Sequence, residues 1–426
     1  MSGLFSTLHT ASSGMRVNQK SIQTVSHNIS NINTPGYSRQ RVEVETNRPL
    51  YMPSLNNNIS KGQLGMGVQV TDVTRARNTF YDYQFRTQYS KYGQISAKYD
   101  YYTSIENIVK EPSEHGISAN LNKFFDGWEE LSKDTNNNSS KNLVVENGVN
   151  LSTLISDTYE KLHALKGDIN SNIDKEIEEI NSMLDKLKAL EKDINVVGGT
   201  GSTPNDLLDE KDRILDELSS KLDIQNKDVQ ELLKDGKLDR TELENALNNG
   251  VQASGTLQGY HEMSQKVDSY TNSLKQISDG IVDSINKAFG GTFFEKGNPE
   301  NGEPLIKVNQ DLKHDPSLID IDKDKAKAIF DVSKQKVEID GKNITINDHY
   351  NSFAERIGID AQKVIKDEAH QREIITATDE ARMSVSGVSL DEEMISLIQL
   401  QHSYGANAKV LATVNQLLDV VINGLI

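Results

Sequence analysis

Three short segments carry side chains whose types and spacing suggest metal chemistry. His261-Glu262-Met263-Ser264-Gln265 begins like a zinc-binding helix, in which two histidines one turn apart hold the metal and the glutamate activates water. Gln265 stands where the second histidine is required, so the segment cannot complete this site. We interpret His261 as a surface residue of a helix.

The other two segments have the carboxylate spacing of calcium loops. Residues 320–324 read Asp-Ile-Asp-Lys-Asp, but Lys325 replaces the glycine of the sharp turn and Asp331 stands where a bidentate glutamate belongs. Residues 235–242 match the second half of an EF-hand loop, whereas Leu233 occupies a ligand position of the first half. The sequence therefore predicts no metal site, with calcium at residues 235–242 as the open alternative.

No other group of residues resembles a catalytic centre. The 9 histidines are dispersed, no serine or threonine lies in a nucleophile elbow, and the chain has no cysteine, which excludes disulfides and thiolate chemistry. We therefore expect a protein that is not an enzyme and that needs no cofactor. No apolar run approaches the ~18 residues of a membrane span, and the first residues do not resemble a signal peptide, so we expect a soluble chain without a cleaved leader.

Charge is distributed unevenly along the 426 residues. The net charge is −17, yet residues 1–100 carry 11 Lys and Arg against 5 Asp and Glu, and the remainder carries 35 against 58. A basic head on an acidic body argues against a nucleic-acid-binding protein. The acidic surface can simply be solvated, or the basic head can pair with acidic neighbours in an assembly.

The elements that organise the chain are two heptad stripes, one at each end. Apolar residues follow a 4,3 spacing in both, interrupted by Asn18 in the first and by Gln401 and Asn415 in the second. Such stripes need a partner helix, so we expect the two ends to meet in one coiled coil, closed on itself or shared with neighbouring copies. Ordinary amphipathic helices on a globular core are the alternative. The expected interface comprises Leu4, Leu8, Met15, Ile22, Val25, Ile29 and Ile32, with Leu390, Met394, Leu397, Tyr404, Leu411, Leu418 and Ile422.

Local signals mark where the terminal helices stop and start. Pro35-Gly36 ends the first helix and supplies the central positions of a type II turn. Ser389 with Glu392 three residues later predicts a capping box at the start of the last helix. Because isolated helices cannot offset their ordering entropy, we expect residues 1–35 and 395–426 to be disordered in the free monomer.

Between the ends, the pattern predicts a mainly α fold with minor β structure, built of long helices, short β-hairpins and the terminal coiled coil. We expect four parts: residues 1–38 as the N-terminal half of the coiled-coil domain, 39–75 as a β-loop connection, 76–383 as a rod-like helical body, and 384–426 as the C-terminal half of the coiled coil. An Asp-Gly turn predicts a small hairpin near residues 336–346.

Two segments resemble a known family. Residues 26–37, Ser-His-Asn-Ile-Ser-Asn-Ile-Asn-Thr-Pro-Gly-Tyr, resemble the signature shared by bacterial flagellar rod, hook and hook-associated proteins. Residues 38–40 and 386–394, the latter Ser-Gly-Val-Ser-Leu-Asp-Glu-Glu-Met, are similar to the hook-associated protein 1 family in particular. The resemblance covers about residues 1–110 and 350–426 and extends to residues 205–209 and 255–260.

The resemblance implies an extracellular structural protein of the flagellum, at the junction of hook and filament, that serves motility. It implies export through the flagellar type III secretion apparatus, self-assembly through the terminal segments, contacts with the hook protein and the next hook-associated protein, and an export chaperone on the C-terminal segment. The chain departs from many relatives in having only a short segment, about residues 228–249, in place of an outer β-rich domain. Another rod or hook protein is the main alternative, and a secreted metal-binding adhesin or enzyme is the third.

Overall fold

The structure is a computed structural model that describes residues 2–48, 65–339 and 341–423. Long helices dominate it, and the strands of the described residues form antiparallel two-stranded sheets, which confirms the expected mainly α fold with minor β structure. None of the helices in these ranges is both long enough and apolar enough to cross a membrane. Residues 49–64 of the expected β-loop connection lie outside the described residues.

The chain forms two compact units. Unit 1 contains Met1–Gln88, Asn181–Ser219 and Ile374–Ile426, and unit 2 contains Tyr89–Ile180 and Ser220–Glu373. The expected body at residues 76–383 is therefore divided, because residues 76–88, 181–219 and 374–383 belong with the terminal helices. Four long helices contribute residues to both units: α2 (Thr79–Val109), α4 (Asn138–Gly198), α5 (Asn205–Lys221) and α11 (Ile346–Ser386).

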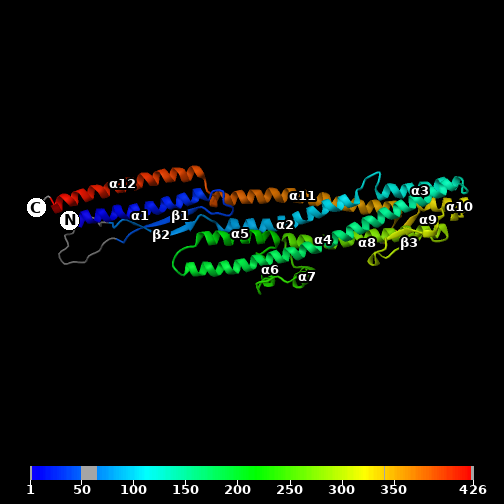
Figure 1. Ribbon diagram of the computed structural model, residues 1–426, viewed down its shortest axis with the longest axis horizontal. Coiled ribbons are helices and arrows are strands. Elements are labelled where there is room, and N and C mark those ends of the chain that lie inside the picture. Colours follow the sequence, from blue (N-terminus) through cyan, green and yellow to red (C-terminus); the bar gives the residue numbers. More distant parts are fainter. Residues whose placement is uncertain (1, 49–64, 340, 424–426) are drawn as a thin grey trace. The chain divides into compact units, whose positions relative to one another are not determined.

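Unit 1 is built around the two terminal helices, α1 (Ser2–Ser30) and α12 (Leu390–Asn423), which lie side by side (Figure 1). A hairpin of β1 (Gln40–Thr46) and β2 (Val68–Arg75) packs on α1, with Val42 paired to Val73 and a bulge between Glu43 and Val44. Between α1 and β1, Gly36 has a φ of 79° and the Tyr37 N–H donates to Thr34 O at 3.2 Å. This is the type II turn geometry that a Pro-Gly pair favours.

Unit 2 has its own aromatic core. Trp128 of α3 (Ile117–Lys133) is fully buried against the rings of Phe124, Phe289 and Phe293, and Phe294 packs on Phe124. Buried aromatic residues supply a large share of the hydrophobic free energy of such a core. The other elements of this unit are α6 (Lys227–Leu232), α7 (Arg240–Asn248), α8 (Gly255–Phe289), β3 (Phe294–Lys296), η1 (Pro299–Asn301), β4 (Ile306–Val308), α9 (Gln310–His314), η2 (Pro316–Leu318), α10 (Lys323–Val332), β5 (Lys336–Ile339) and β6 (Lys342–Thr345).

Candidate assembly interface

The terminal helices form an antiparallel pair with a defined register. Asn28 of α1 bonds Glu393 of α12, and 14 residues away on each helix Gly14 lies against the side chain of Asn407. The two stripes therefore meet within one chain. The expectation of disordered ends is not what the structure shows, because residues 2–30 and 390–423 are helices that bury apolar surface against each other.

The contact surface between α1 and α12, here called the seam, uses only half of the stripe expected on α12. Leu397, Tyr404, Leu411 and Leu418 are half-buried. Met394 and Ile422, in contrast, are 44% and 60% exposed, and Leu390 at the first position of α12 is 49% exposed. The second seam column lies one residue earlier in the sequence and consists of Glu393, Leu400, Asn407 and Val414.

The same shift of one residue occurs on α1. Leu4, Ala11, Asn18 and Val25 lie in the seam, and the register places Thr7, Gly14, Ser21 and Asn28 beside them. The same register leaves the remaining column of the expected stripe outside the seam, and its residues, Leu8, Met15, Ile22 and Ile29, are half-buried. Ile32 follows the end of α1 and is 36% exposed.

The columns left out of the seam lie together. Each residue of these columns comes one position after a seam residue in the sequence of its own helix. Because the two helices run in opposite directions, this step turns the side chains of both helices toward the same side of the pair. This side is opposite to the β1–β2 hairpin, because Ser13, on the other side of α1, accepts from the Val68 N–H of β2. We call it the open face; it consists of Phe5, Leu8, Met15, Ile22 and Ile29 of α1 with Met394, Ile398, Gln401, Gly405, Ala408, Ala412, Asn415, Asp419 and Ile422 of α12.

A buried polar cluster holds the register of the helix pair. The Asn28 side chain donates to Glu393 Oε2 at 3.0 Å and to Gln40 O at 2.9 Å, and it accepts from the Tyr37 hydroxyl at 2.8 Å and from the Gln40 N–H at 2.9 Å. All four hydrogen bonds of the amide are therefore made. Because an unsatisfied buried polar group is costly, any other register of α1 on α12 is disfavoured.

Arg39 ties the start of α12 to the turn. Its guanidinium donates to Glu393 Oε1 at 2.7 Å and to Glu392 Oε2 at 2.8 Å, and its N–H donates to Ser386 O at 2.9 Å. The Glu393 N–H donates to Ser389 O at 3.0 Å. Glu392 of the expected capping box is thus bound by Arg39, and the role of Ser389 as a side-chain cap stays a prediction.

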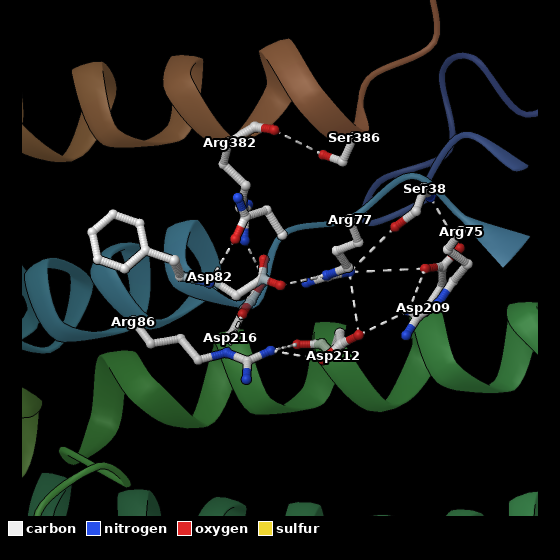
Figure 2. A network of polar contacts seen from close by, with 12 residues as sticks. Ser38, Arg75, Arg77, Asp82, Arg86, Asp209, Asp212, Asp216, Arg382 and Ser386 are labelled. Atoms are coloured by element: carbon white, nitrogen blue, oxygen red, sulfur yellow. Dashed lines mark hydrogen bonds and ion pairs between the residues drawn. The ribbon is translucent and has the colours of Figure 1, made fainter.

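Below this cluster, four arginines and four aspartates form a largely buried network (Figure 2). Arg75 donates to Asp209 and Asp212 at 2.8 Å each, and Arg86 donates to Asp212 at 2.9 Å and to Asp216 at 2.6 Å. Arg77 donates to Asp82 at 2.8 Å. Arg382 donates to Asp216, and its guanidinium carbon lies 3.8 Å from the centroid of the Phe85 ring. The network connects β2, α2, α5 and α11 within unit 1.

The network determines the charge state of its central carboxylate. Burial by itself would raise the pKa of Asp212, but the charge of Arg77 and the hydrogen bonds from Arg75 and Arg86 outweigh it and hold the pKa below its usual 3.8. Part of the basic head is therefore neutralised by the acidic body inside the same chain. The sequence analysis did not predict this network. Its signal in the sequence is the i, i+3, i+7 spacing of Asp209, Asp212 and Asp216, which places the three carboxylates on one face of α5.

The segments considered for metal chemistry are engaged in other contacts. Asp239 caps α7 by accepting from the N–H groups of Thr241 and Glu242, and Arg240 pairs with Asp174 and Glu244. His261 lies 2.9 Å from Gln265, and Asp322 caps α10 by accepting from the Lys325 N–H. In the part of the chain that the structure describes, no group of three or more His, Asp or Glu side chains is placed to hold a metal ion.

Comparison with known families matches both halves of the helix pair. A model described as "Flagella basal body rod protein" matches residues 8–37, and one described as "Flagellar basal body rod FlgEFG protein C-terminal" matches residues 380–424. These ranges contain most of α1 and α12 and, of the polar cluster between them, Asn28, Tyr37 and Glu393. The chain is therefore a member of the flagellar axial proteins, the class that includes rod and hook proteins.

The particular family is flagellar hook-associated protein 1. A model described as "Flagellar hook-associated protein FlgK helical domain" matches residues 102–239. Flagellar hook-associated protein 1 of Bacillus subtilis is 29% identical over 100% of this chain and 99% of its own length, and that of Escherichia coli is 21% identical over 98% and 99%. A solved structure of the flagellar hook junction protein FlgK from Burkholderia pseudomallei shares 16% identity and a TM-score of 0.41 over 50% of this chain and 47% of its own.

Proposed function

We propose that this protein is a structural component of the bacterial flagellum at the junction of hook and filament, where it assembles with other copies of itself through its paired terminal helices. The open face carries this proposal. Apolar residues such as Ile398, 49% exposed, and Ile422 stay uncovered after the two helices have paired. A contiguous apolar surface of this kind marks a protein interaction site.

The seam and the open face have different roles in this proposal. Leu4, Val25, Leu397, Tyr404, Leu411 and Leu418 hold the helix pair together within one chain, and Leu8, Met15, Ile22, Ile29, Met394 and Ile422 contact neighbouring subunits. The Pro35-Gly36 turn and the polar cluster around Asn28 hold the pair in one register. This division is supported by the register of α1 on α12 and by the exposure of Met394 and Ile422 in the single chain.

The proposed partners are the hook protein, the next hook-associated protein and an export chaperone that binds the C-terminal segment before secretion. The proposed location is extracellular, on the flagellum, after export through the flagellar type III apparatus. We also propose that the protein has no enzymatic activity. The family membership and the structural use of the acidic and basic clusters support this proposal.

Electron microscopy of flagella from a strain that lacks this protein tests the function. We expect hooks without filaments, with filament protein released into the medium. Normal filaments on such cells would contradict the proposal. Immunolabelling of isolated wild-type flagella separates the junction from the rod and the hook, because the label should appear only where hook and filament meet.

A further inference from the structure

The hydroxyl group of Tyr37 lies between two side chains of α1 and has only one hydrogen to donate. Its oxygen is 2.8 Å from Asn28 Oδ1 and 3.0 Å from His27 Nδ1. A hydroxyl donates one hydrogen bond and accepts others with its lone pairs. The neighbour that receives the hydrogen of Tyr37 therefore decides whether the His27 nitrogen donates or accepts.

The groups around Asn28 fix the orientation of its amide. Nδ2 lies 2.9 Å from Gln40 O and 3.0 Å from Glu393 Oε2, and both oxygens accept, because Arg39 pairs with Glu393 as a carboxylate. On the other side of the amide, Oδ1 lies 2.9 Å from the Gln40 N–H, which can only donate. The reverse orientation would set donor against donor and acceptor against acceptor. Oδ1 is a carbonyl oxygen without a hydrogen, so it accepts the hydrogen of Tyr37.

Tyr37 keeps the hydrogen that this bond requires. Burial raises the pKa of its hydroxyl, and the charge of Asp206 raises it further. The neutral hydroxyl gives its hydrogen to Asn28, and only lone pairs remain on the side of His27. Nδ1 of His27 must therefore carry the hydrogen of the 3.0 Å contact.

A carboxylate on the opposite side of the His27 ring favours a hydrogen on the other nitrogen. Asp206 Oδ2 lies 3.9 Å from Nε2, which is too far for a direct hydrogen bond, and the two side chains are 42% and 68% exposed, so water screens the attraction. The contact of Nδ1 with Tyr37 has hydrogen-bond length, and the two rings also meet edge to face with centroids 5.6 Å apart. In the neutral ring the contact with Tyr37 is the stronger one and decides where the hydrogen lies.

We propose that His27 is a positioning residue of the helix pair, which donates from Nδ1 to Tyr37 and so commits the Tyr37 hydroxyl to Asn28. The hydrogen bonds then run in one direction, from His27 through Tyr37 and Asn28 to α12. A hydrogen on Nε2 instead would make Nδ1 an acceptor that competes with Asn28 for the hydrogen of Tyr37, and the register of α1 on α12 would lose support. This inference rests on the proposed function, because the register that His27 supports is that of the proposed assembly surface.

Nitrogen NMR of the imidazole ring tests the position of the hydrogen. Spectra of the monomer, labelled at the histidine nitrogens, are recorded at about pH 9, where an imidazole is neutral and its two nitrogens have different shifts. His27→Asn, which removes one of the 9 histidines, identifies the signals. We expect the hydrogen on Nδ1 in the wild type and on Nε2 in Tyr37→Phe, in which the carboxylate of Asp206 decides. A hydrogen on Nε2 in the wild type, or the same pattern in Tyr37→Phe, would overturn the proposal.

Two substitutions of His27 separate its donor from the volume of its ring. His27→Asn keeps an N–H donor bonded to the same Cγ as Nδ1, whereas His27→Leu has none, and His370→Leu makes the latter change at an exposed histidine of α11. We expect His27→Leu to lower the ratio of folded to unfolded monomer about fivefold, and His27→Asn and His370→Leu to lower it less than about twofold. Urea titration measures this ratio. Equal losses in the two His27 variants would overturn the proposal.

Failure of this inference is distinguishable from failure of the proposed function. If only the position of the hydrogen is wrong, the monomer carries it on Nε2 while the wild-type protein is present in isolated flagella. If the function is wrong, the wild-type protein is absent from isolated hook–filament structures, and the spectra of the monomer are unaffected.

Discussion

Asn28 and Glu393 are 365 positions apart in the sequence, and their side chains form a 3.0 Å hydrogen bond with both residues 1% exposed. This contact connects the family signature at the end of α1 with the start of α12. It also explains two polar residues inside an otherwise apolar helix pair, because an amide and a carboxylate that bond only in one register select that register.

Replacing Asn28 should therefore destabilise the helix pair. Asn28→Ala removes the hydrogen bonds of the Asn28 amide to Glu393 Oε2 and to the Gln40 N–H and C=O, and the Tyr37 hydroxyl keeps only its contact with His27 Nδ1, so we expect the free energy of unfolding to fall by about 3 kcal/mol. Urea titration of the purified protein measures it. Asn33→Ala, at an exposed position of the turn that follows α1, should change it by less than about 0.5 kcal/mol. Equal effects of the two variants would show that the amide contacts do not stabilise the pair.

The arginine–aspartate network should make unit 1 sensitive to acid. The pKa of Asp212 is lower in the folded chain than in the unfolded chain. As the pH falls below 3.8, the unfolded chain therefore takes up a proton at this carboxylate before the folded chain does, and the stability that the ionised carboxylate contributes is lost as the pH falls through the lowered pKa. We expect Asp212→Asn to be less stable at neutral pH and to lose less stability on going from about pH 7 to about pH 3. The exposed Asp185→Asn should keep the wild-type pH dependence of the free energy of unfolding. If the free energy of unfolding of Asp212→Asn fell as steeply toward acid pH as that of the wild type, this role of Asp212 would be contradicted.

Charges introduced into the two kinds of column should have different effects. Ile22→Asp places a carboxylate on the open face, and we expect the helix pair to form but junction assembly to fail. Leu418→Asp places it in the seam, and we expect the last turns of α12 to separate from α1 and assembly to fail as well. Circular dichroism of the monomer and electron microscopy of flagella measure the two outcomes. Normal filament attachment in either variant would rule out assembly through these helices.

Amide exchange should report a graded stability along the terminal helices. The polar cluster and the buried Val25 lie near the end of α1 and the start of α12, whereas Phe5 and Val420 at the opposite end are exposed. We expect the slowest exchange near Asn28 and Glu393 in dilute monomer, with exchange becoming faster toward residues 2–8 and 417–423. Uniformly fast exchange over both helices would mean that the pair forms only in the assembly.

The long helices and the type II turn could be predicted because their signals are local. Helical periodicity, the Pro35-Gly36 pair and the Gly290 end of α8 act within a few residues of the chain. The arginine–aspartate network could not be predicted in the same way, because Arg75 and Asp209 are separated by 134 positions and meet only after β2 and α5 are placed together. The division of the expected body into two units has the same origin.

The sequence alone determined that both ends are heptad helices that need partners and that the candidate metal segments are incomplete. It could not decide which column of each stripe faces which partner. Columns one residue apart, such as those of Glu393 and Met394, lie only about 100° apart around a helix, so both fit a 4,3 pattern. The tertiary structure made this choice, because the bonds of Asn28 and Arg39 to Glu393 rotate α12 so that Met394, Ile398 and Ile422 stay outside the seam.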